Sequence, residues 1–548
     1  MTIPTIERKS SKYIYLDMRK LIISTLLFFS VVASVSAQFR MSDGSRKVAT
    51  AMAVIENMYV DDVDDKKLGE DVVKAMLEKL DPHSVYISAE EVAEMNEPLE
   101  GNFDGIGVSF NMMTDTLYII EALAGGPSEK VGIRAGDKIM YVDDVLISGV
   151  KMATKDVMSR LKGPKGTKVK VQVLRKGVDK LMDFNITRDK IPVYSIDASY
   201  MVNNNTGYIH TLRFGATTTN EFREAVKRLK SQGMQNLILD LTYNTGGYMG
   251  PAIELADEFL NKGKLIVYTE GRNQPRRDEI STNKGTFEKG KLVIMINEGS
   301  ASSSEILSGA IQDWDRGVIV GRRSFGKGLV QRPIPLPDES MIRLTVARYY
   351  TPTGRSIQKP YTKGDADTYR MEEYERYLHG EMMHADSIHF ADSLKHTTLI
   401  NKRTVYGGGG IMPDYFVPID TSFVSDYYKK LYVKAITLGV AYNEVDQYRD
   451  EIRAKYASSE DFYNNFVVSE ELLNKMIAGA EKDNITFDKE GFEKSKAVLS
   501  SQIKAYIGRD VFDTEAMVRS INDQNEIYKK ALEIIEDDES YNKLLNGN

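Results

Sequence analysis

The sequence predicts a multidomain α/β protein made of four consecutive parts, and two observations lead to this fold class. The chain has 548 residues, more than a single hydrophobic core usually organises. The spacing of its apolar residues also changes along the chain, from a helical period to strand alternation, then to alternating strands and helices, and back to a helical period. These changes divide the chain into a helical segment (43–100), a mostly β domain (101–191), a layered α/β core (192–420) and a C-terminal helical domain (421–548).

The first 37 residues have the pattern of an upstream extension followed by a secretory signal. Arg19 and Lys20 precede an apolar run, residues 21–35, and small residues then lead to Ala37. The run is shorter than the roughly 20 residues of a membrane-spanning helix, so cleavage after Ala37 is expected. Residues 1–17 precede Met18 and carry no expected function. We therefore expect export to the periplasm or cell envelope, or a membrane tether if the signal is not cleaved.

Bulk composition excludes several classes of function. The chain carries 79 acidic and 72 basic side chains and a net charge of −7, so it has no basic excess for binding nucleic acid. It contains no cysteine, which excludes disulfides, a thiol nucleophile and thiolate metal sites. We expect neither a metal nor another cofactor.

Apolar residues at helical spacing predict two amphipathic helices in residues 43–80. The first pattern consists of Val48, Met52, Val54, Ile55 and Met58, and the second of Leu68, Val72, Val73, Met76 and Leu80. Pro82 ends the second helix because proline disfavours helical geometry in the preceding residue. His83 follows in the turn, where a capping or packing role is expected.

Residues 101–191 change to short alternating strands, predicted at 107–110, 117–120, 138–142 and 169–174, with a short helix after Pro127. The segment resembles a PDZ domain. In such domains a glycine-rich loop exposes backbone N–H groups to the terminal carboxylate of a peptide, which pairs with the adjacent strand. That loop is Gly105, Ile106, Gly107 and Val108 here. The alternative is that its glycines only make a tight turn.

The layered core is predicted from strands at 206–213, 236–241 and 292–296 and a helix at 220–230. The second of these strands leads into a glycine turn at Gly246 and Gly247. The third leads into a serine-rich turn, residues 297–305, and then an apolar helix. A hydroxyl at such a helix start, Ser302, is either an N-cap without chemistry or a nucleophile near a partial positive charge. The turn alone does not decide between them.

A glycine-flanked lysine, Lys327, favours the nucleophile. It lies in residues 324–331, after a predicted strand at 318–321 and beside Phe325, Leu329 and Val330. A serine needs an adjacent base, and lysine is a base only when neutral, which an apolar environment promotes. The oxyanion of the tetrahedral intermediate would then be held by backbone N–H groups, with Ser303 and Gly246 as candidates.

Residues 302–331 resemble the core motif of the C-terminal processing peptidases, also called tail-specific proteases. Companion motifs at 80–84, 240–247, 350–355 and 407–414 extend the resemblance over residues 43–418. The resemblance implies a crotonase-like layered protease core, with Ser302 as nucleophile, Lys327 as base and Gln331 orienting the lysine. Asp313 matches an acidic position with a structural role. Thr242 and Thr245 depart from the family pattern in the glycine loop.

Histidine does not supply an alternative base. Of the six histidines, only His210 lies in a predicted core strand, where a hydrogen-bonded structural role is expected. His379, His384 and His389 lack the one-turn offset of zinc motifs.

Two later segments carry no predicted chemistry. Residues 359–397 are charged and are expected to form a surface excursion of the core. From residue 421 on, helical spacing returns, with a stabilising or dimerising role expected.

The sequence therefore predicts an exported serine endopeptidase with a Ser-Lys dyad that recognises C-terminal peptides of exported proteins through its PDZ domain. The alternative is a PDZ adaptor or scaffold with a non-catalytic protease-like core. A homo-oligomer is left open. Intact Ser302, Lys327 and Gln331 favour the enzyme over the adaptor.

Overall fold

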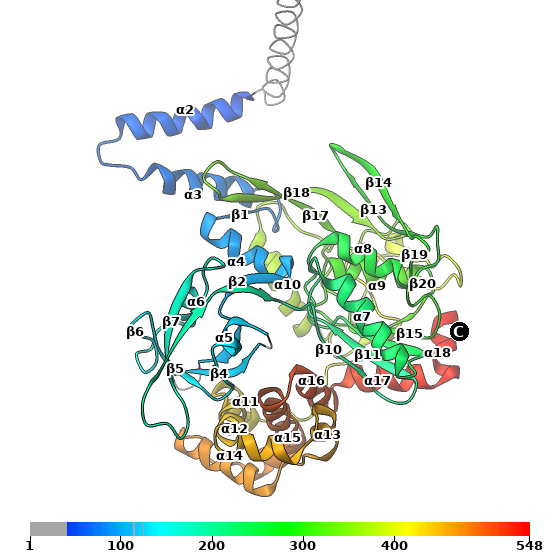
Figure 1. Ribbon diagram of the computed structural model, residues 1–548. Coiled ribbons are helices and arrows are strands. Elements are labelled where there is room, and N and C mark those ends of the chain that lie inside the picture. Colours follow the sequence, from blue (N-terminus) through cyan, green and yellow to red (C-terminus); the bar gives the residue numbers. More distant parts are fainter. Residues whose placement is uncertain (1–40, 113–114, 124, 548) are drawn as a thin grey trace, which may run out of the picture. The chain divides into compact units, whose positions relative to one another are not determined.

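The structure is a computed structural model that describes residues 41–112, 115–123 and 125–547 (Figure 1). The predicted signal, residues 1–37, lies outside them. The chain divides after Met76 into two compact units. The first contains helix α2 (Asp43–Met58), capped by Ser42, and most of α3 (Asp65–Glu78), at the predicted positions. No helix among the described residues is long and apolar enough to cross a membrane.

The second unit opens with the predicted turn at Pro82. The Asp81 carboxylate accepts the N–H groups of His83 and Ser84 at 3.0 and 3.1 Å. Strand β1 (Val85–Ile87) and helix α4 (Ala89–Glu100) follow. β1 pairs with β18 (Met341–Tyr350), so the segment predicted as helical also adds a strand to the core. Three residues are too few for a periodic signal in the sequence.

The predicted PDZ domain is a mostly β body with its own hydrophobic core. Its sheet runs in the order β3, β4, β5, β7, β8, with β6 beside β5. The elements are β3 (Val108–Asn111), β4 (Leu117–Ala122), α5 (Pro127–Lys130), β5 (Lys138–Val142), β6 (Val145–Leu146), α6 (Thr154–Leu161), β7 (Lys168–Leu174) and β8 (Met182–Thr187). A pair of strands, β2 (Asn102–Gly105) and β9 (Asp189–Pro192), joins the two points where the chain enters and leaves the domain.

The core is built on a six-stranded sheet in the order β10, β11, β12, β15, β16, β21. Its strands are β10 (Ile196–Met201), β11 (Thr206–Thr211), β12 (Asn236–Asp240), β15 (Leu292–Ile296), β16 (Val318–Gly321) and β21 (Tyr415–Phe416). All neighbours except β10 and β11 are parallel. The central strands β15 and β16 are buried on both faces, as their continuous apolar runs predict.

Helices cover both faces of this sheet (Figure 1). One face, with Leu237, Leu239 and Ile294, packs against α7 (Thr218–Ser231), α8 (Met249–Asp257) and α9 (Ser303–Asp313). Alternate residues of the same strands face α16 (Thr514–Asn522), α17 (Glu526–Glu536) and α18 (Asp538–Asn546). The result is a layered α/β/α core.

A second sheet, in the order β1, β18, β13, β14 with β17 also paired to β18, stands beside the first. Its remaining strands are β13 (Leu265–Gly271), β14 (Gln274–Ile280) and β17 (Leu329–Pro335). The loop between β16 and β17 carries Lys327, so this loop connects the two sheets.

Two predicted boundaries differ from the structure. Helix α10 (Ala366–Leu378) lies in the predicted surface excursion, yet its Tyr369 and Arg376 are buried. The predicted C-terminal helical domain also divides. Helices α11 (Asp426–Val433), α12 (Ile436–Lys455), α13 (Ser459–Asn465), α14 (Glu470–Lys482) and α15 (Lys489–Val511) share a core of their own, whereas α16 to α18 complete the protease core. Helical spacing alone does not tell which surface a helix covers.

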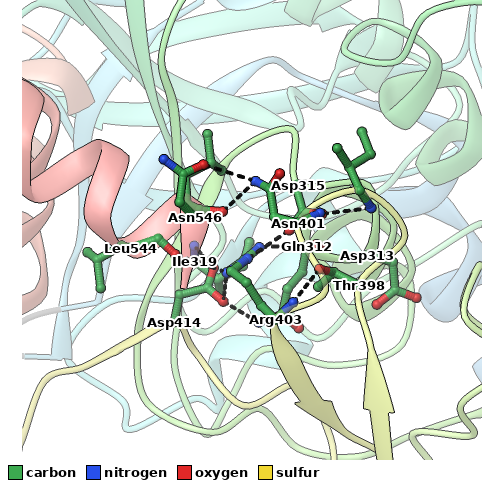
Figure 2. A network of polar contacts seen from close by, with 12 residues as sticks. Gln312, Asp313, Asp315, Ile319, Thr398, Asn401, Arg403, Asp414, Leu544 and Asn546 are labelled. Carbon is green, nitrogen blue, oxygen red and sulfur yellow. Dashed lines mark hydrogen bonds and ion pairs between the residues drawn. The ribbon is translucent and has the colours of Figure 1, made fainter. Parts of the chain in front are cut away.

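A buried polar network fastens the last helix to the core (Figure 2). Arg403 donates to Asp315 at 2.7 Å and to Asp414 at 2.5 Å, and its Nη1 also reaches the carbonyl of Leu544 at 3.4 Å. Asn401 donates to the carbonyl of Leu545 at 2.7 Å. These contacts tie the end of the chain to the loop before β20 (Thr404–Tyr406), itself paired with β19 (Lys395–Thr397).

Candidate active site

Ser302 stands at the turn between buried strand β15 and helix α9, where it is the N-cap of the helix. Its backbone has φ 55° and ψ −110°, a conformation that a non-glycine residue adopts only under strain. Strain of this kind concentrates at functional sites because the surrounding structure has to enforce it. The turn therefore presents the serine in a geometry that a simple helix cap does not need.

The buried carboxylate of Glu305 enforces this geometry from inside. It accepts the N–H of Ser302 at 2.7 Å and the N–H groups of Gly326 and Lys327 at 2.7 and 2.9 Å. The hydroxyl of Ser324 is a fourth donor at 2.6 Å. Glu305 therefore joins the serine turn to the lysine loop.

Burial raises the pKa of Glu305 to about 7, against the lowering effect of its four hydrogen bonds. Sequence reasoning assigns Glu305 no role. The feature of the sequence that could have indicated its role is that Glu305 lies in the first turn of a helix whose other residues there are mostly apolar or small.

Tyr349 on β18 makes a second connection between the two loops. Its hydroxyl lies 3.1 Å from the carbonyl of Ser302 and also contacts the carbonyl of Lys327. The side chain is fully buried, which raises its pKa well above the ordinary value and keeps it a hydrogen-bond donor. The backbones of Ser302 and Lys327 are thus held by the same side chain.

The surroundings of Lys327 favour its neutral form. Burial lowers its pKa, and the nearby positive charge of Arg343 lowers it further. The carboxylates of Glu305 and Asp81 act in the opposite direction. The predicted apolar setting is therefore strengthened by a like charge that the sequence did not reveal.

Among the described residues, the side chains of Ser302 and Lys327 do not contact each other through a hydrogen bond: none links the hydroxyl of Ser302 to the amine of Lys327. The amide of Gln331 donates to the carbonyl of His83 instead of binding Lys327. In proteases without substrate, catalytic hydrogen bonds are often long and tighten only in the complex.

The predicted oxyanion donors divide into one that is free and one that is engaged. The N–H of Gly246 donates to the Asn244 side chain at 2.9 Å, so it is not available to an oxyanion. The N–H groups of Ser303 and Gly247 have no acceptor among the described residues. The Gly246 backbone lies directly against Ser302, because a Cβ there would stand 2.9 Å from the Ser302 Cβ. The geometry therefore favours Gly247 over the predicted Gly246.

The other predicted residues have structural surroundings. Asp313 forms a fully buried ion pair with Arg355. Thr242 donates to Asp240 from both its N–H and its hydroxyl, at 2.8 and 2.7 Å, which stabilises the departure from the family loop. His210 lies 2.7 Å from Asp197. The described residues contain no group of three or more His, Cys, Asp or Glu that could hold a metal ion.

The PDZ loop lines an apolar groove of about 300 Å³, bounded by Phe103, Gly105, Ile106, Gly107, Val108, Phe110, Thr154, Met158, Leu161 and Lys162. Strand β3, which follows the loop, is at the edge of its sheet. The N–H groups of Ile106 and Gly107 have no acceptor in the described part of the chain. The structure thus brings all four predicted loop residues to one groove beside an open strand edge.

This fold and site define a serine protease with an inserted PDZ domain. Family models agree along the chain: the Activating protease CtpB N-terminal domain matches residues 29–91, the PDZ domain 105–186, Peptidase family S41 205–368, and a family of unknown function (DUF8443) 427–513.

Known relatives identify the family. The chain is 38% identical over 309 residues to a carboxy-terminal-processing protease of Bartonella bacilliformis, which covers 56% of this chain and 70% of the relative. It is 33% identical over 351 residues to the carboxy-terminal processing protease CtpA of Bacillus subtilis, covering 63% and 74%. The solved photosystem II D1 C-terminal processing protease matches with 26% identity and a TM-score of 0.33, over 59% and 92% of the two chains. The chain belongs to the carboxy-terminal processing proteases.

Proposed function

We propose that this serine protease is exported, captures the C-terminal peptide of a substrate protein in its PDZ groove, and cleaves it with Ser302 and Lys327. The observation that carries the proposal is the fastening of the serine turn to the lysine loop by the buried carboxylate of Glu305. An adaptor would have no need for a strained serine beside a lysine whose neutral form is favoured.

The proposed chemistry is acyl transfer. The hydroxyl oxygen of Ser302 attacks the scissile carbonyl carbon while the neutral amine of Lys327 accepts its proton. The N–H groups of Ser303 and Gly247 hold the oxyanion. The ammonium of Lys327 then protonates the leaving amine as the C–N bond breaks. Water then attacks the acyl carbon while Lys327 accepts its proton, and the ammonium returns that proton to the oxygen of Ser302 as the ester bond breaks.

The proposed role of Gln331 is to hold Lys327 in this step. It lies on β17, four residues after the lysine, and its side-chain amide donates to the main-chain carbonyl of His83, which leaves its side-chain oxygen as the acceptor for Lys327. In enzymes without substrate, such catalytic contacts are often long and tighten in the complex.

The groove supports recognition of an apolar C-terminal residue. Its lining is mostly apolar, and the free N–H groups of Ile106 and Gly107 suit a terminal carboxylate. The substrate backbone would extend the sheet at β3. A peptide with a free C-terminus should therefore bind, and the same peptide with an amidated C-terminus should bind at least about tenfold more weakly.

The dyad is tested by acylation. A fluorophosphonate probe should attach to Ser302, as mass spectrometry of the digested protein would show, and Ser302→Ala should cleave no test peptide. Lys327→Met should block both labelling and cleavage, because no neutral amine remains to activate the serine. The exposed lysine variant Lys363→Met is the matched control. Cleavage by Ser302→Ala at the wild-type rate would assign the reaction to another nucleophile, and neither labelling nor cleavage by the wild-type protein would favour the adaptor.

Export is proposed from the sequence of residues 19–37 alone. Fractionation of cells that express a C-terminally tagged chain should place it in the cell envelope, with an N-terminus at Gln38. A tagged chain that keeps Met18 and stays in the membrane fraction would indicate an uncleaved tether instead.

A further inference from the structure

Tyr369 is buried in a segment that the sequence places on the surface. It lies on helix α10, in the charged stretch between β18 and β19, and only 5% of its surface is exposed. The pKa of Tyr369 is raised above its usual range, mainly by burial, so the phenol keeps its proton.

The hydroxyl of Tyr369 has two hydrogen-bond partners, Gln358 and His83. It accepts a hydrogen bond from the side-chain amide of Gln358 at 3.2 Å and lies 2.9 Å from Nε2 of His83. Burial, together with the charge of Lys327, lowers the pKa of His83 to about 4, so its ring is neutral at neutral pH. A neutral ring can accept a hydrogen bond from the phenol at Nε2, which completes a hydrogen-bond chain from Gln358 through Tyr369 to His83.

Both ends of this chain reach the lysine segment. The carbonyl oxygen of the Gln358 side chain accepts the N–H of Gly328, next to Lys327, at 2.8 Å. The main-chain carbonyl of His83 accepts the side-chain amide of Gln331. One buried hydroxyl therefore connects the residue beside Lys327 to the glutamine that follows it.

The ring of Tyr369 fixes the same loop from its outer side. Its centroid lies 6.0 Å from that of Phe325 in an edge contact. The Nζ of Lys359, 2% exposed and paired with Glu372 at 2.7 Å, lies 4.1 Å from the Phe325 ring centroid and 4.3 Å from that of Tyr369. These contacts hold the Phe325 ring and restrict the movement of the loop.

We propose that Tyr369 is a positioning residue for the active site, whose hydroxyl holds the Lys327 loop and Gln331 in register through Gln358 and His83. The inference rests on the dyad proposed above. It has a physical basis in the glycines that flank Lys327: Gly326 has φ 89°, and a loop of this kind orders only when other groups hold it. A displacement of about 1 Å at a reacting group costs roughly 100-fold in rate.

The test is Tyr369→Phe, which removes the hydroxyl and keeps the ring. We expect kcat for peptide cleavage to fall about 10- to 100-fold with KM little changed. The matched control is Tyr374→Phe on the same helix, where the ring is 55% exposed. Thermal melting of both variants identifies any loss of fold, so that only a rate loss without a matching loss of melting temperature counts.

A pH profile separates positioning from simple stabilisation. The charges that act on Lys327, from Arg343, Glu305 and Asp81, are unchanged in Tyr369→Phe. A loosened loop admits water, which stabilises the ammonium, so the acidic limb of kcat/KM should move to higher pH. A kcat and pH limb equal to those of Tyr374→Phe would overturn the inference. That result alongside an inactive Ser302→Ala leaves the proposed function standing, whereas an active Ser302→Ala overturns both.

Discussion

At the scale of single residues, the active site depends on charged groups that are buried or partly buried. Glu305 has 0% exposure and four donors around its carboxylate; burial raises its pKa to about 7, although the four hydrogen bonds act to lower it. Lys327 stands close by with a positive neighbour, Arg343. The balance between these groups decides how much of the lysine is neutral near pH 7.

Replacing Arg343 by methionine should move the pH dependence of the enzyme in a defined direction. The guanidinium lowers the pKa of Lys327 by repulsion, so its removal raises that pKa. Because only the neutral lysine acts as a base, the acidic limb of kcat/KM should move to higher pH and the rate at neutral pH should fall, with recovery in alkaline buffer. The control is Arg348→Met, an exposed position on the same strand. A limb at the wild-type pH would contradict the assignment of Arg343.

At the scale of elements, the site is made by turns that contact one another closely. The loop after β12 approaches the start of α9 so nearly that a Cβ at Gly246 would lie 2.9 Å from the carbonyl of Ala301 and 3.0 Å from the N–H of Ser303. Gly246 also has φ 101°, where other residues are strained. Two neighbouring parallel strands of the sheet therefore end at the proposed nucleophile and the proposed oxyanion donors.

The change Gly246→Ala should damage the site without breaking any side-chain contact. The added methyl group would push the serine turn, at a cost of about 1–3 kcal/mol in stability and roughly 100-fold in kcat. Gly250→Ala is the control, because that glycine lies in α8 with open space around its Cα. Alanine there should stabilise by about 0.5–1 kcal/mol. Thermal melting and peptide kinetics measure both variants, and wild-type kinetics in Gly246→Ala would refute the close approach.

At the scale of the whole molecule, the end of the chain is part of the protease core. The Arg403 network in Figure 2 holds α18 to the sheet, and its ion pairs with Asp315 and Asp414 are almost fully buried. Removing one member of a buried ion pair is far more costly than forming the pair is favourable. The C-terminal helices should thus unfold together with the catalytic sheet.

The variant Arg403→Met should therefore lose about 3–5 kcal/mol of unfolding free energy, since two carboxylates remain buried without their partner. Denaturant unfolding measures this loss. The exposed pair of Arg370 and Asp367 is the control, where Arg370→Met should cost under about 1 kcal/mol. Equal losses in the two variants would mean that the C-terminal helices do not depend on this network.

The residues of the proposed dyad and the strands that carry them could be read from the sequence because their signals are local. The strands at residues 292–296 and 318–321 are continuous apolar runs, and the structure confirms both. The strand β1 and the buried position of α10 could not be read in this way. Three residues give no period, and the burial of Tyr369 depends on a histidine that lies far away in the sequence.

By itself, the sequence determined the order of the parts, the resemblance to the family and the two residues proposed as nucleophile and base, since a short motif preserves residue types and spacing. What surrounds these two residues could be learned only from the tertiary structure. There Glu305 lies buried between two loops, the N–H of Gly246 donates to the side chain of Asn244, and the last helices pack against the catalytic sheet. The physical reason is that burial and hydrogen bonding depend on groups distant in the chain, which no local pattern records.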